Sequence, residues 1–193
     1  VLKTLVAEGI KISVDTRHAI TMAKAADCGA MLINDVSALS MPNSLETLSK
    51  IDLPIVLMHS NADPSTMQDN PTYNQATLEV YEYLEARINV AKKMGINKEK
   101  IIIDPGIGFG KNLSHNLEII KNLSIFHGLG CPILLGASRK SFIGKISREL
   151  DPNNRLAGSI ASVLWGISQG AQIFRVHDVA ETLQATSVWK NIS

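Results

Sequence analysis

Six hydrophobic runs in this sequence each end in residues that a buried strand would not require. In chain order these residues are Asp15, Asn34 and Asp35, Met58 and His59, Asp104, Ser138 to Lys140, and Arg175 and His177. In a parallel α/β protein the carboxyl ends of all strands lie on one rim, so we expect these side chains to converge on one cavity. A single polar residue at a strand end is often only a cap for the next helix, but six such ends together indicate a shared binding site.

The most distinctive segment is D-P-G-I-G-F-G-K at residues 104–111. Its alternating glycines would let the backbone approach a ligand closely. The glycine spacing is neither that of a dinucleotide-binding G-x-G-x-x-G motif nor that of a phosphate-binding Walker A loop. A plain glycine-rich turn is the alternative to a ligand-binding loop.

Two groups of cations predict an anion site. The segment Ser138–Ser141 (S-R-K-S) follows Gly136 and is expected to open a helix, and a helix N-terminus with serine, arginine and lysine favours anions. Arg175 and His177 alternate along the last predicted strand, so they should point to the same face and form a pair suited to a phosphate. An exposed basic turn and a hydrogen-bonded core histidine are the alternatives.

The hydrophobic runs themselves predict the elements that position these groups. Short runs rich in β-branched residues or leucine, continuous rather than alternating, are typical of strands buried on both faces of a parallel sheet. The predicted strands are Ile12–Asp15, Met31–Asn34, Ile55–Met58, Ile101–Asp104, Ile133–Gly136 and Ile173–Val176. Apolar residues at spacings of three and four predict helices over Asn74–Met94 and Arg155–Gln169, which Gly95 and Gly170 would end.

Six strand–helix units in 193 residues predict an α/β fold with a single domain over residues 1–193. Two architectures fit: an open doubly wound sheet, which needs nothing further, and a (β/α)8 TIM barrel, which needs about 250 residues. Val1–Val6 has a helical pattern without an initiating methionine, and this start and the polar strand ends favour the barrel. We therefore expect six of eight βα units, with the first two strands missing from this chain. The polar segment Ser60–Thr72 is expected to be a surface loop.

The composition excludes several classes of partner. The 19 lysine and arginine residues nearly balance the 18 aspartate and glutamate residues, and there is no basic stripe of the kind that binds nucleic acids or anionic membranes. No apolar run approaches the ~18 residues of a membrane span. Cys28 and Cys131 lie far apart without metal-ligand spacing, so we expect both to be buried free thiols in a reducing compartment.

Seven short motifs together resemble the dihydropteroate synthases, a family of pterin-binding TIM-barrel enzymes of folate biosynthesis. In that family's order, they are S-V-D-T at 13–16, I-N-D-V at 33–36, V-L-M-H at 56–59, D-P-G-I-G-F-G-K at 104–111, S-R-K-S at 138–141, R-L-A-G-S at 155–159 and R-V-H-D-V at 175–179. The likeness covers essentially the whole chain. It implies a transferase that condenses 6-hydroxymethyl-7,8-dihydropterin diphosphate with p-aminobenzoate, giving 7,8-dihydropteroate and diphosphate.

The resemblance also implies a role for each matching residue. The residues implied for the pterin are Asp15, Asn34, Met58, Asp104, Gly136 and Lys140. Those implied for p-aminobenzoate are Phe109, Ser138 and Arg139, and those implied for the diphosphate are Arg175 and His177. Lys140, Arg175 and His177 are the implied catalytic residues.

The resemblance further implies a Mg²⁺ ion, a cytoplasmic homodimer and a sulfonamide target. The family's Mg²⁺-binding asparagine loop and its closing Thr-Arg loop have no counterpart here, which implies no metal ligand in this chain and little activity from the chain alone. The expected dimer interface is Arg155–Gln169 and the C-terminal helix, near Trp165 and Trp189. The alternatives are a pterin-binding methyltransferase barrel, disfavoured because it has no diphosphate for Arg175 and His177 to bind, and a non-catalytic pterin-binding fragment.

Overall fold

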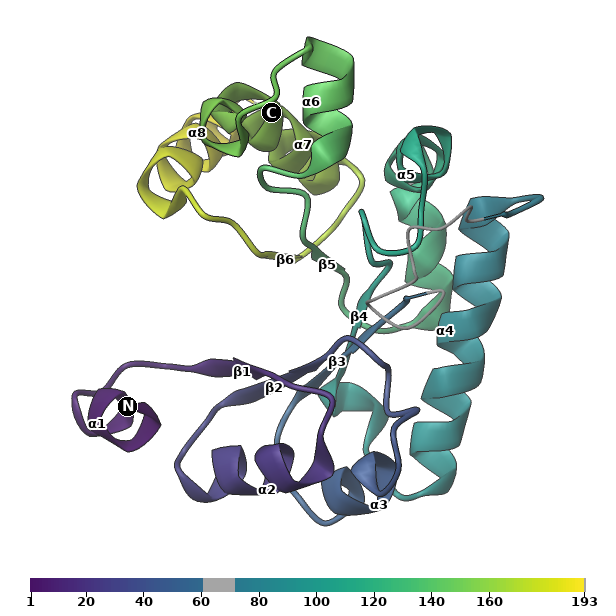
Figure 1. Cartoon of the computed structure of the whole chain (residues 1–193), viewed down its shortest axis with the longest axis vertical. Coiled ribbons are helices and arrows are strands. Elements are labelled where there is room, and N and C mark those ends of the chain that lie inside the picture. The colour runs from purple at the N-terminus through teal and green to yellow at the C-terminus, as the bar shows by residue number, and fades with distance from the viewer. Residues whose placement is uncertain (61–71, 193) are drawn as a thin grey trace.

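Parallel strands form the centre of the computed structural model, which describes residues 1–60 and 72–192 (Figure 1). One sheet has the order β1 (Ser13–Asp15), β2 (Leu32–Asp35), β3 (Ile55–Met58) and β4 (Ile101–Asp104). A second has β5 (Leu134–Leu135) beside β6 (Ile173–Phe174), and a bridge between Ile103 and Ile133 joins the two. Strands that are neighbours in sequence are therefore neighbours in space, without the reversal of order that a doubly wound sheet has. The expected parallel α/β arrangement of a TIM barrel is confirmed.

Helices follow every strand and cover the outside of the sheet. They are α1 (Leu2–Ala7), α2 (Ala19–Asp27), α3 (Ser44–Ser49), α4 (Ala76–Lys93), α5 (Leu113–Lys121), α6 (Ser141–Ser147), α7 (Leu156–Ser168) and α8 (Val179–Ile192), with 3₁₀ turns at Lys98–Lys100, Leu123–Leu129 and Pro152–Asn154. Figure 1 shows α2 and α3 below β1–β3, α4 and α5 beside β3 and β4, and α6–α8 together above β5 and β6.

The predicted elements are confirmed, with shifts at their ends. α4 and α7 each end within two residues of the predicted helix bounds, and Gly95 and Gly170 follow them with φ of 89° and 85°. β6 is shorter than predicted, because its ladder with β5 ends at the pair of Leu135 and Phe174. Arg175 and His177 therefore lie beyond the strand, and the prediction that they alternate along it is wrong. The loop predicted over Ser60–Thr72 lies, apart from its ends, outside the described residues.

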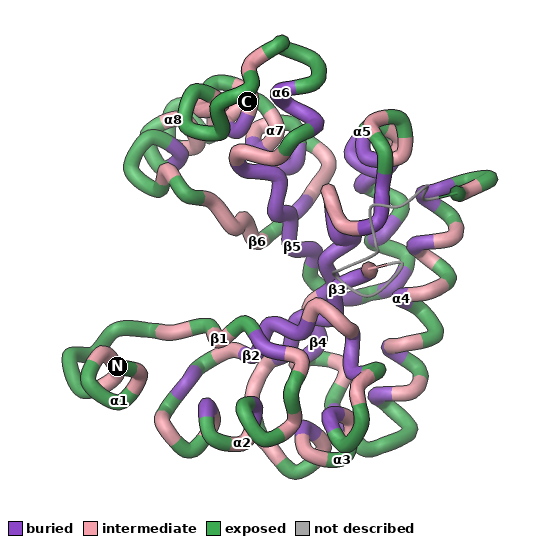
Figure 2. The backbone as a smooth tube through the Cα atoms, viewed as in Figure 1, coloured by how far each residue is buried: buried purple, intermediate pink, exposed green. Residues whose placement is uncertain are grey.

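Burial increases from the outer strands to the middle of the sheet. Every residue of β3 is buried, and Leu57, Ile103 and Phe126 are among the largest fully buried side chains (Figure 2). In β1, Ser13 and Asp15 are exposed, and both residues of β6 are only half-buried. The expectation of strands buried on both faces is therefore wrong for β1 and β6, since neither has a strand on its outer side within the described residues.

The two cysteines differ in their surroundings. Cys131 is buried as expected, whereas Cys28 is half-buried because it lies at the C-terminal end of α2. Both are free thiols. In residues 1–60 and 72–192, no helix has the length and apolar character needed to cross a membrane.

A buried lysine holds the glycine-rich loop after β4 in shape. The loop's glycines have positive φ, 69° at Gly106, a conformation that is costly for residues with a Cβ. Lys111, which is 3% exposed, donates from Nζ to the carbonyl oxygens of Gly106 at 3.0 Å and Phe109 at 2.9 Å. The same Nζ lies 2.8 Å from Nδ1 of His59. Three acceptors match the three donors of an ammonium group, so the lysine fixes the loop from inside.

Two further side chains complete this support. Asn116 of α5 accepts from the amide of Gly108 at 2.6 Å and donates to the carbonyl of Lys111 at 3.2 Å. The hydroxyl of Tyr73 donates to the carbonyl of Gly110 at 3.0 Å. At Gly106 an added Cβ would collide with the carbonyl oxygen of His59. The loop is thus confined by contacts from the chain after β3, from α5 and from the segment before α4.

We predict that the centre of the sheet tolerates truncation poorly. Ile103→Ala removes most of a fully buried side chain and leaves a cavity, which costs about 2–5 kcal/mol. Ile20→Ala is the matched control, because Ile20 is 72% exposed and should change the free energy of unfolding by no more than about 0.5 kcal/mol. Urea denaturation of both variants measures the difference; similar losses for the two would contradict the described core.

His59 predicts sensitivity to acid. Burial lowers its pKa from 6.5 to about 3, and the nearby Lys111 cation acts in the same direction. The folded state therefore keeps His59 neutral, while the unfolded chain takes up a proton below pH 6.5. The stability that depends on neutral His59 is complete above that pH and falls as pH drops from 6.5 towards 3, by about 1.4 kcal/mol per pH unit at most.

The measurement is the free energy of unfolding between about pH 4.5 and about pH 7. In this range His59 becomes protonated in the unfolded chain but stays neutral in the folded protein. His59→Gln should flatten the curve, since glutamine does not titrate. His18→Gln is the control, because His18 is exposed at the start of α2. An unchanged slope in His59→Gln would show that carboxylates alone govern the acid response.

Candidate functional site

A buried carboxylate at the end of β4 lies at the centre of the site. Asp104 is 1% exposed, and its Oδ1 accepts from the amide of Gly106 at 2.7 Å. Burial raises the pKa of the Asp104 carboxyl, and the nearby Lys140 and Arg175 cations oppose that shift. Its Oδ2 is directed towards Arg175, whose Nη2 lies 3.5 Å away. A carboxylate held in this way can accept hydrogen bonds from a planar ligand.

Asn34 at the end of β2 adds an amide to the same rim. The residue is 3% exposed, and its Nδ2 donates to Oδ2 of Asp15 at 3.0 Å. Its Oδ1 is buried without a hydrogen-bond partner in the described part of the chain. Buried acceptors are almost always satisfied, so an open one at a strand end points to a ligand that donates.

Arg175 connects the two acidic residues of the rim. Its guanidinium lies 3.5 Å from the Asp104 carboxylate and 3.7 Å from that of Asp15. Gly136 allows this approach, because a Cβ there would lie 3.2 Å from Nη2 of Arg175. With 40% of its side chain exposed, Arg175 keeps part of its guanidinium available to an anion.

Lys140, the residue before α6, reaches across to the glycine-rich loop. Its Nζ donates to the carbonyl oxygen of Ile107 and lies 4.5 Å from the centre of the Phe109 ring. Burial lowers the pKa of Lys140 to about 8, although the Asp104 carboxylate opposes the shift. The lysine is thus a cation between an aromatic ring and a buried carboxylate.

Met58 forms part of the wall between these groups. It is fully buried and lies opposite Asp104 in the register of β3 and β4. Next to it in the chain, His59 is buried against Lys111. Burial lowers the pKa of Lys111 to about 7, and Asp104 opposes the shift. His59 and Lys111 therefore support the glycine-rich loop from the buried side, away from the rim.

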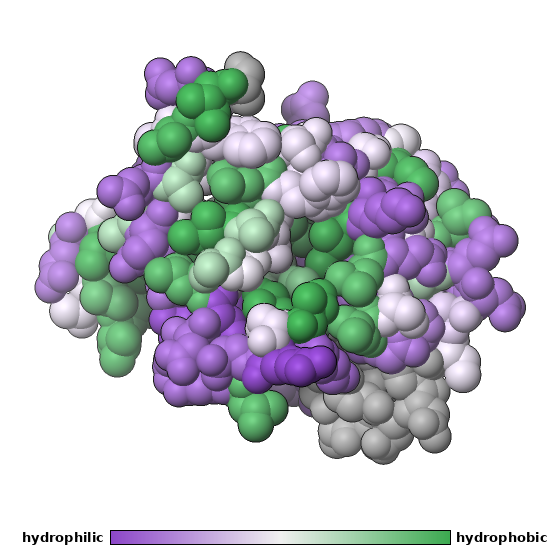
Figure 3. Space-filling view, turned by 90° about the horizontal axis from the view of Figure 1, so that it is seen from above, coloured by the Kyte–Doolittle hydropathy of each residue, from purple (hydrophilic) through white to green (hydrophobic). Residues whose placement is uncertain are grey.

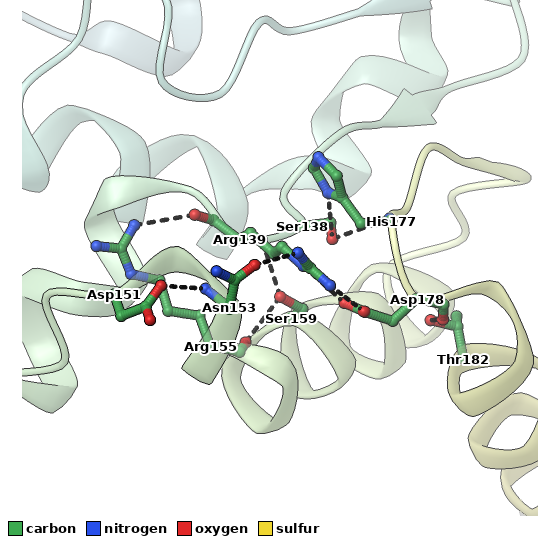
Figure 4. A network of polar contacts seen from close by, with 9 residues as sticks. All are labelled: Ser138, Arg139, Asp151, Asn153, Arg155, Ser159, His177, Asp178 and Thr182. Carbon is green, nitrogen blue, oxygen red and sulfur yellow. Dashed lines mark hydrogen bonds and ion pairs between the residues drawn. The ribbon is translucent and has the colours of Figure 1, made fainter.

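Ser138 and Arg139 are bound to the loop that follows β6 (Figure 4). The hydroxyl of Ser138 lies 3.0 Å from Nδ1 of His177 and accepts from the His177 amide at 3.2 Å. Both carboxylate oxygens of Asp178 accept from the Arg139 guanidinium, and Oδ1 of Asn153 accepts from its Nη1 at 2.8 Å. The guanidinium of Arg139 is therefore hydrogen-bonded to Asp178 and Asn153 of the protein itself.

An apolar groove of about 750 Å³ opens beside the rim, between β1 and β2 on one side and β6 and α8 on the other. Asn34 and Arg175 are among its polar lining groups, and Leu32, Phe174 and Leu183 are among its apolar ones. The groove runs along the outer sides of β1 and β6, where the described residues place no further strand, so we assign the ligand to the rim and not to this groove.

Most of the predicted site residues converge. One connected set contains Asp15, Asn34, Asp104, Gly136 and Arg175, a second contains Phe109 and Lys140, and a third contains Ser138, Arg139 and His177. Sequence reasoning missed the partners that hold them, namely Lys111, Asn116, Arg155 and Asp178. All of these except Asn116 stand within the seven motifs, and those positions were the only signal that could have found them.

The described residues include no group of three or more histidine, cysteine, aspartate or glutamate side chains that could hold a metal ion. Asp104 and Asp15 are instead matched by Arg175. The acidic groups of the rim therefore suit a hydrogen-bond donor better than a divalent cation.

Comparison with known proteins agrees with this geometry. The sequence pattern of the family described as pterin binding enzyme matches residues 1–177. Dihydropteroate synthase of Escherichia coli K12 is 45% identical over 177 residues, 92% of this chain and 62% of that protein. The chain thus spans less than two thirds of that relative's length.

Solved structures extend the likeness to the fold. Dihydropteroate synthase from Xanthomonas albilineans in complex with 7,8-dihydropteroate is 39% identical, with a TM-score of 0.93 over 99% of this chain and 72% of that one. The Thermus thermophilus enzyme in complex with 4-aminobenzoate is 36% identical, with a TM-score of 0.95 over 100% of this chain and 75% of that one. The fold, the site and the sequence agree: this chain belongs to the dihydropteroate synthase family of pterin-binding enzymes.

Proposed function

We propose that this chain carries the substrate-binding face of a dihydropteroate synthase. The reaction condenses 6-hydroxymethyl-7,8-dihydropterin diphosphate with p-aminobenzoate to give 7,8-dihydropteroate and diphosphate. The observation that carries the proposal is the buried acceptor pair of the rim, the Asp104 carboxylate and the unpartnered Oδ1 of Asn34, placed beside cations. A methyltransferase would have no use for the cations, because it releases no diphosphate.

The pterin ring supplies the donors that this pair lacks. Its ring N–H and 2-amino group would donate to Asp104, and its remaining polar edge would meet the Asn34 amide and Asp15. Met58 and Gly136 would form the walls of the slot, since both are buried beside Asp104 or Arg175. Such an arrangement recognises a planar heterocycle by its hydrogen-bonding edge.

The second substrate would lie beside Phe109 and Lys140. An aromatic ring can pack against the half-buried Phe109, and the carboxylate of p-aminobenzoate can accept from Ser138 near the start of α6. Lys140 would donate to the pterin carbonyl from between the two substrates. Sulfonamides, which share the aryl amine, would bind at this same place.

In the proposed reaction, the cations of the site act on the diphosphate leaving group. The amine nitrogen of p-aminobenzoate attacks the pterin methylene carbon, the carbon–oxygen bond breaks, diphosphate keeps the electron pair, and the amine gives up one proton. Arg175 and His177 would neutralise the charge that develops on diphosphate. Prepositioned donors of this kind stabilise a transition state because they need no reorganisation during the reaction.

A Mg²⁺ ion on the diphosphate is part of this proposal. The metal would supply further charge neutralisation on the leaving group when bound. Its ligands would have to come from outside the residues named here, because the described part of the chain forms no acidic or histidine cluster for it.

A homodimer in the cytoplasm completes the proposal. A hollow between α7 and α8 is lined by apolar side chains, including Leu156, Leu164, Val188 and Trp189. Figure 3 views the molecule from above, the side on which α6–α8 lie in Figure 1, and shows hydrophobic residues gathered across the middle of that face. Trp165 and Ile192 are 44% and 76% exposed, as expected of residues that a second copy would cover. The free thiols of Cys28 and Cys131 suit a reducing compartment.

Asp104→Asn tests the pterin assignment. The substitution replaces an acceptor by a donor opposite a ring donor, and a buried mismatch of this kind costs about 2–4 kcal/mol. Calorimetry with the pterin should show weaker binding on that scale. Asp52→Asn is the control, because the Asp52 side chain is 95% exposed and far from the rim. Equal affinities of the Asp104→Asn and wild-type proteins would remove Asp104 from the pterin site.

Arg175→Ala tests the anion assignment. The variant should weaken binding of pterin diphosphate by about tenfold or more, since a charge-assisted contact is worth roughly 1.5–3 kcal/mol, and should affect the bare pterin much less. Arg148→Ala, which removes an exposed arginine after α6, should change neither affinity. Equal losses for the two ligands would assign Arg175 to holding the acidic rim together.

A further inference from the structure

The pairing between β5 and β6 continues beyond the ends of the strands as two side-chain contacts. In the strands, Leu134 pairs with Ile173 and Leu135 with Phe174. Beyond them, Ser138 contacts His177 and Arg139 contacts Asp178, each across the same 39 residues of sequence. The register of the parallel strands is therefore kept by side chains where the backbone ladder has stopped.

The outer of the two contacts is the stronger. Nε of Arg139 donates to Oδ2 of Asp178 at 3.1 Å, and Nη2 donates to Oδ1 of the same carboxylate. The Arg139 and Asp178 side chains are 27% and 16% exposed, so water screens the pair only in part. Bidentate pairing fixes direction as well as distance, which a lysine in the same place would not do.

The backbone of Arg139 is held independently of its side chain. Its φ is 57°, an unfavourable conformation for a residue with a Cβ. Its amide donates to Oγ of Ser159 at 2.8 Å, and its carbonyl accepts from Nη1 of Arg155 at 3.0 Å (Figure 4). Strain that is held from several sides usually serves a position that function requires.

Each member of the pair adjoins a residue of the site. Lys140 follows Arg139 in the chain, and His177 precedes Asp178. Asp178 also begins α8, because its carbonyl accepts from the Thr182 amide at 3.0 Å and from the Thr182 hydroxyl at 2.7 Å. Because Ser159 and Arg155 hold the backbone of Arg139 separately, breaking the pair would release the β6–α8 loop, which carries His177, from this fixed point.

We propose that Arg139 and Asp178 are a positioning pair that locks the β5–α6 loop to the β6–α8 loop and thereby sets the place of His177 for the anionic ligand. This inference rests on the proposed function for the identity of that ligand. It assigns Arg139 a role through Asp178, in contrast to direct contact with p-aminobenzoate. The two roles differ in one respect: only a positioning pair makes Asp178 as important as Arg139.

The first experiment reads the pair without any substrate. Protein labelled with ¹⁵N-histidine has five histidines, and the His177 ring signal is assigned by its absence in His177→Gln. Arg139→Met and Asp178→Asn should move that signal to the same new position, and the double variant should not move it further. Arg139→Lys keeps the positive charge but loses the bidentate guanidinium, so it should move the His177 signal part of the way. This conservative variant also provides a reading if Arg139→Met fails to fold. Glu46→Gln, in an exposed ion pair with Lys50, is the control and should leave it in place.

The second experiment measures binding of pterin diphosphate and of p-aminobenzoate by calorimetry. Arg139→Met and Asp178→Asn should each lower the affinity for pterin diphosphate about tenfold. The double variant should also lower it about tenfold and not a hundredfold, because the two changes break one contact. A loss of p-aminobenzoate binding in Arg139→Met that Asp178→Asn does not share would overturn the proposal in favour of a direct ligand.

The two experiments separate failure of the inference from failure of the proposed function. If the wild-type protein binds no pterin diphosphate, the proposed function fails, while the His177 signal still decides whether the pair controls the loop. If that signal is unmoved in Arg139→Met, Arg139→Lys and Asp178→Asn alike, the pair does not position His177 and the inference is wrong.

Discussion

The carboxylate of Asp104 is a negative charge in the apolar interior of a barrel, and such a group is costly unless other groups compensate for it. The amide of Gly106 donates to it directly, which requires the left-handed turn that glycine adopts easily. Lys140 and Arg175 supply positive charge from the loops after β5 and β6. The groups that compensate this buried charge therefore come from the ends of β4, β5 and β6, and together they form the candidate site.

The groups that compensate Asp104 need supports of their own. Lys111 satisfies the inward carbonyls of the glycine-rich loop, so the loop cannot relax away from the carboxylate. On the opposite side, Arg139 and Asp178 join the two loops that carry the cations. The Lys111 contacts are shielded from water and the Arg139–Asp178 pair is shielded in part, which makes them stronger than contacts at the open surface.

The polar groups of the rim differ in how many hydrogen-bond partners they have within the protein. Asp104 has an amide donor and nearby cations, whereas Oδ1 of Asn34 has no partner in the described residues. The cations towards the anion side are more exposed, with 40% of the Arg175 side chain in solvent. A buried, partly unsatisfied edge beside an accessible cation suits a ligand with a planar polar ring and a charged tail, because the ring replaces missing hydrogen bonds while the tail keeps some of its water.

The sequence by itself determined where the strands lie and which residues stand at their carboxyl ends, because burial on a sheet imposes a local pattern and parallel strands present those ends together. The pattern left a doubly wound sheet and a barrel open, and the strand order of the structure separates the two. Asp104, Lys140 and Arg175 could therefore be predicted as neighbours. Only the tertiary structure decided that Arg139 pairs with Asp178, that Lys111 meets His59, and that β6 stops before Arg175. These contacts join residues 39 and 52 positions apart, and their partners depend on strand register and loop conformation, which no local spacing encodes.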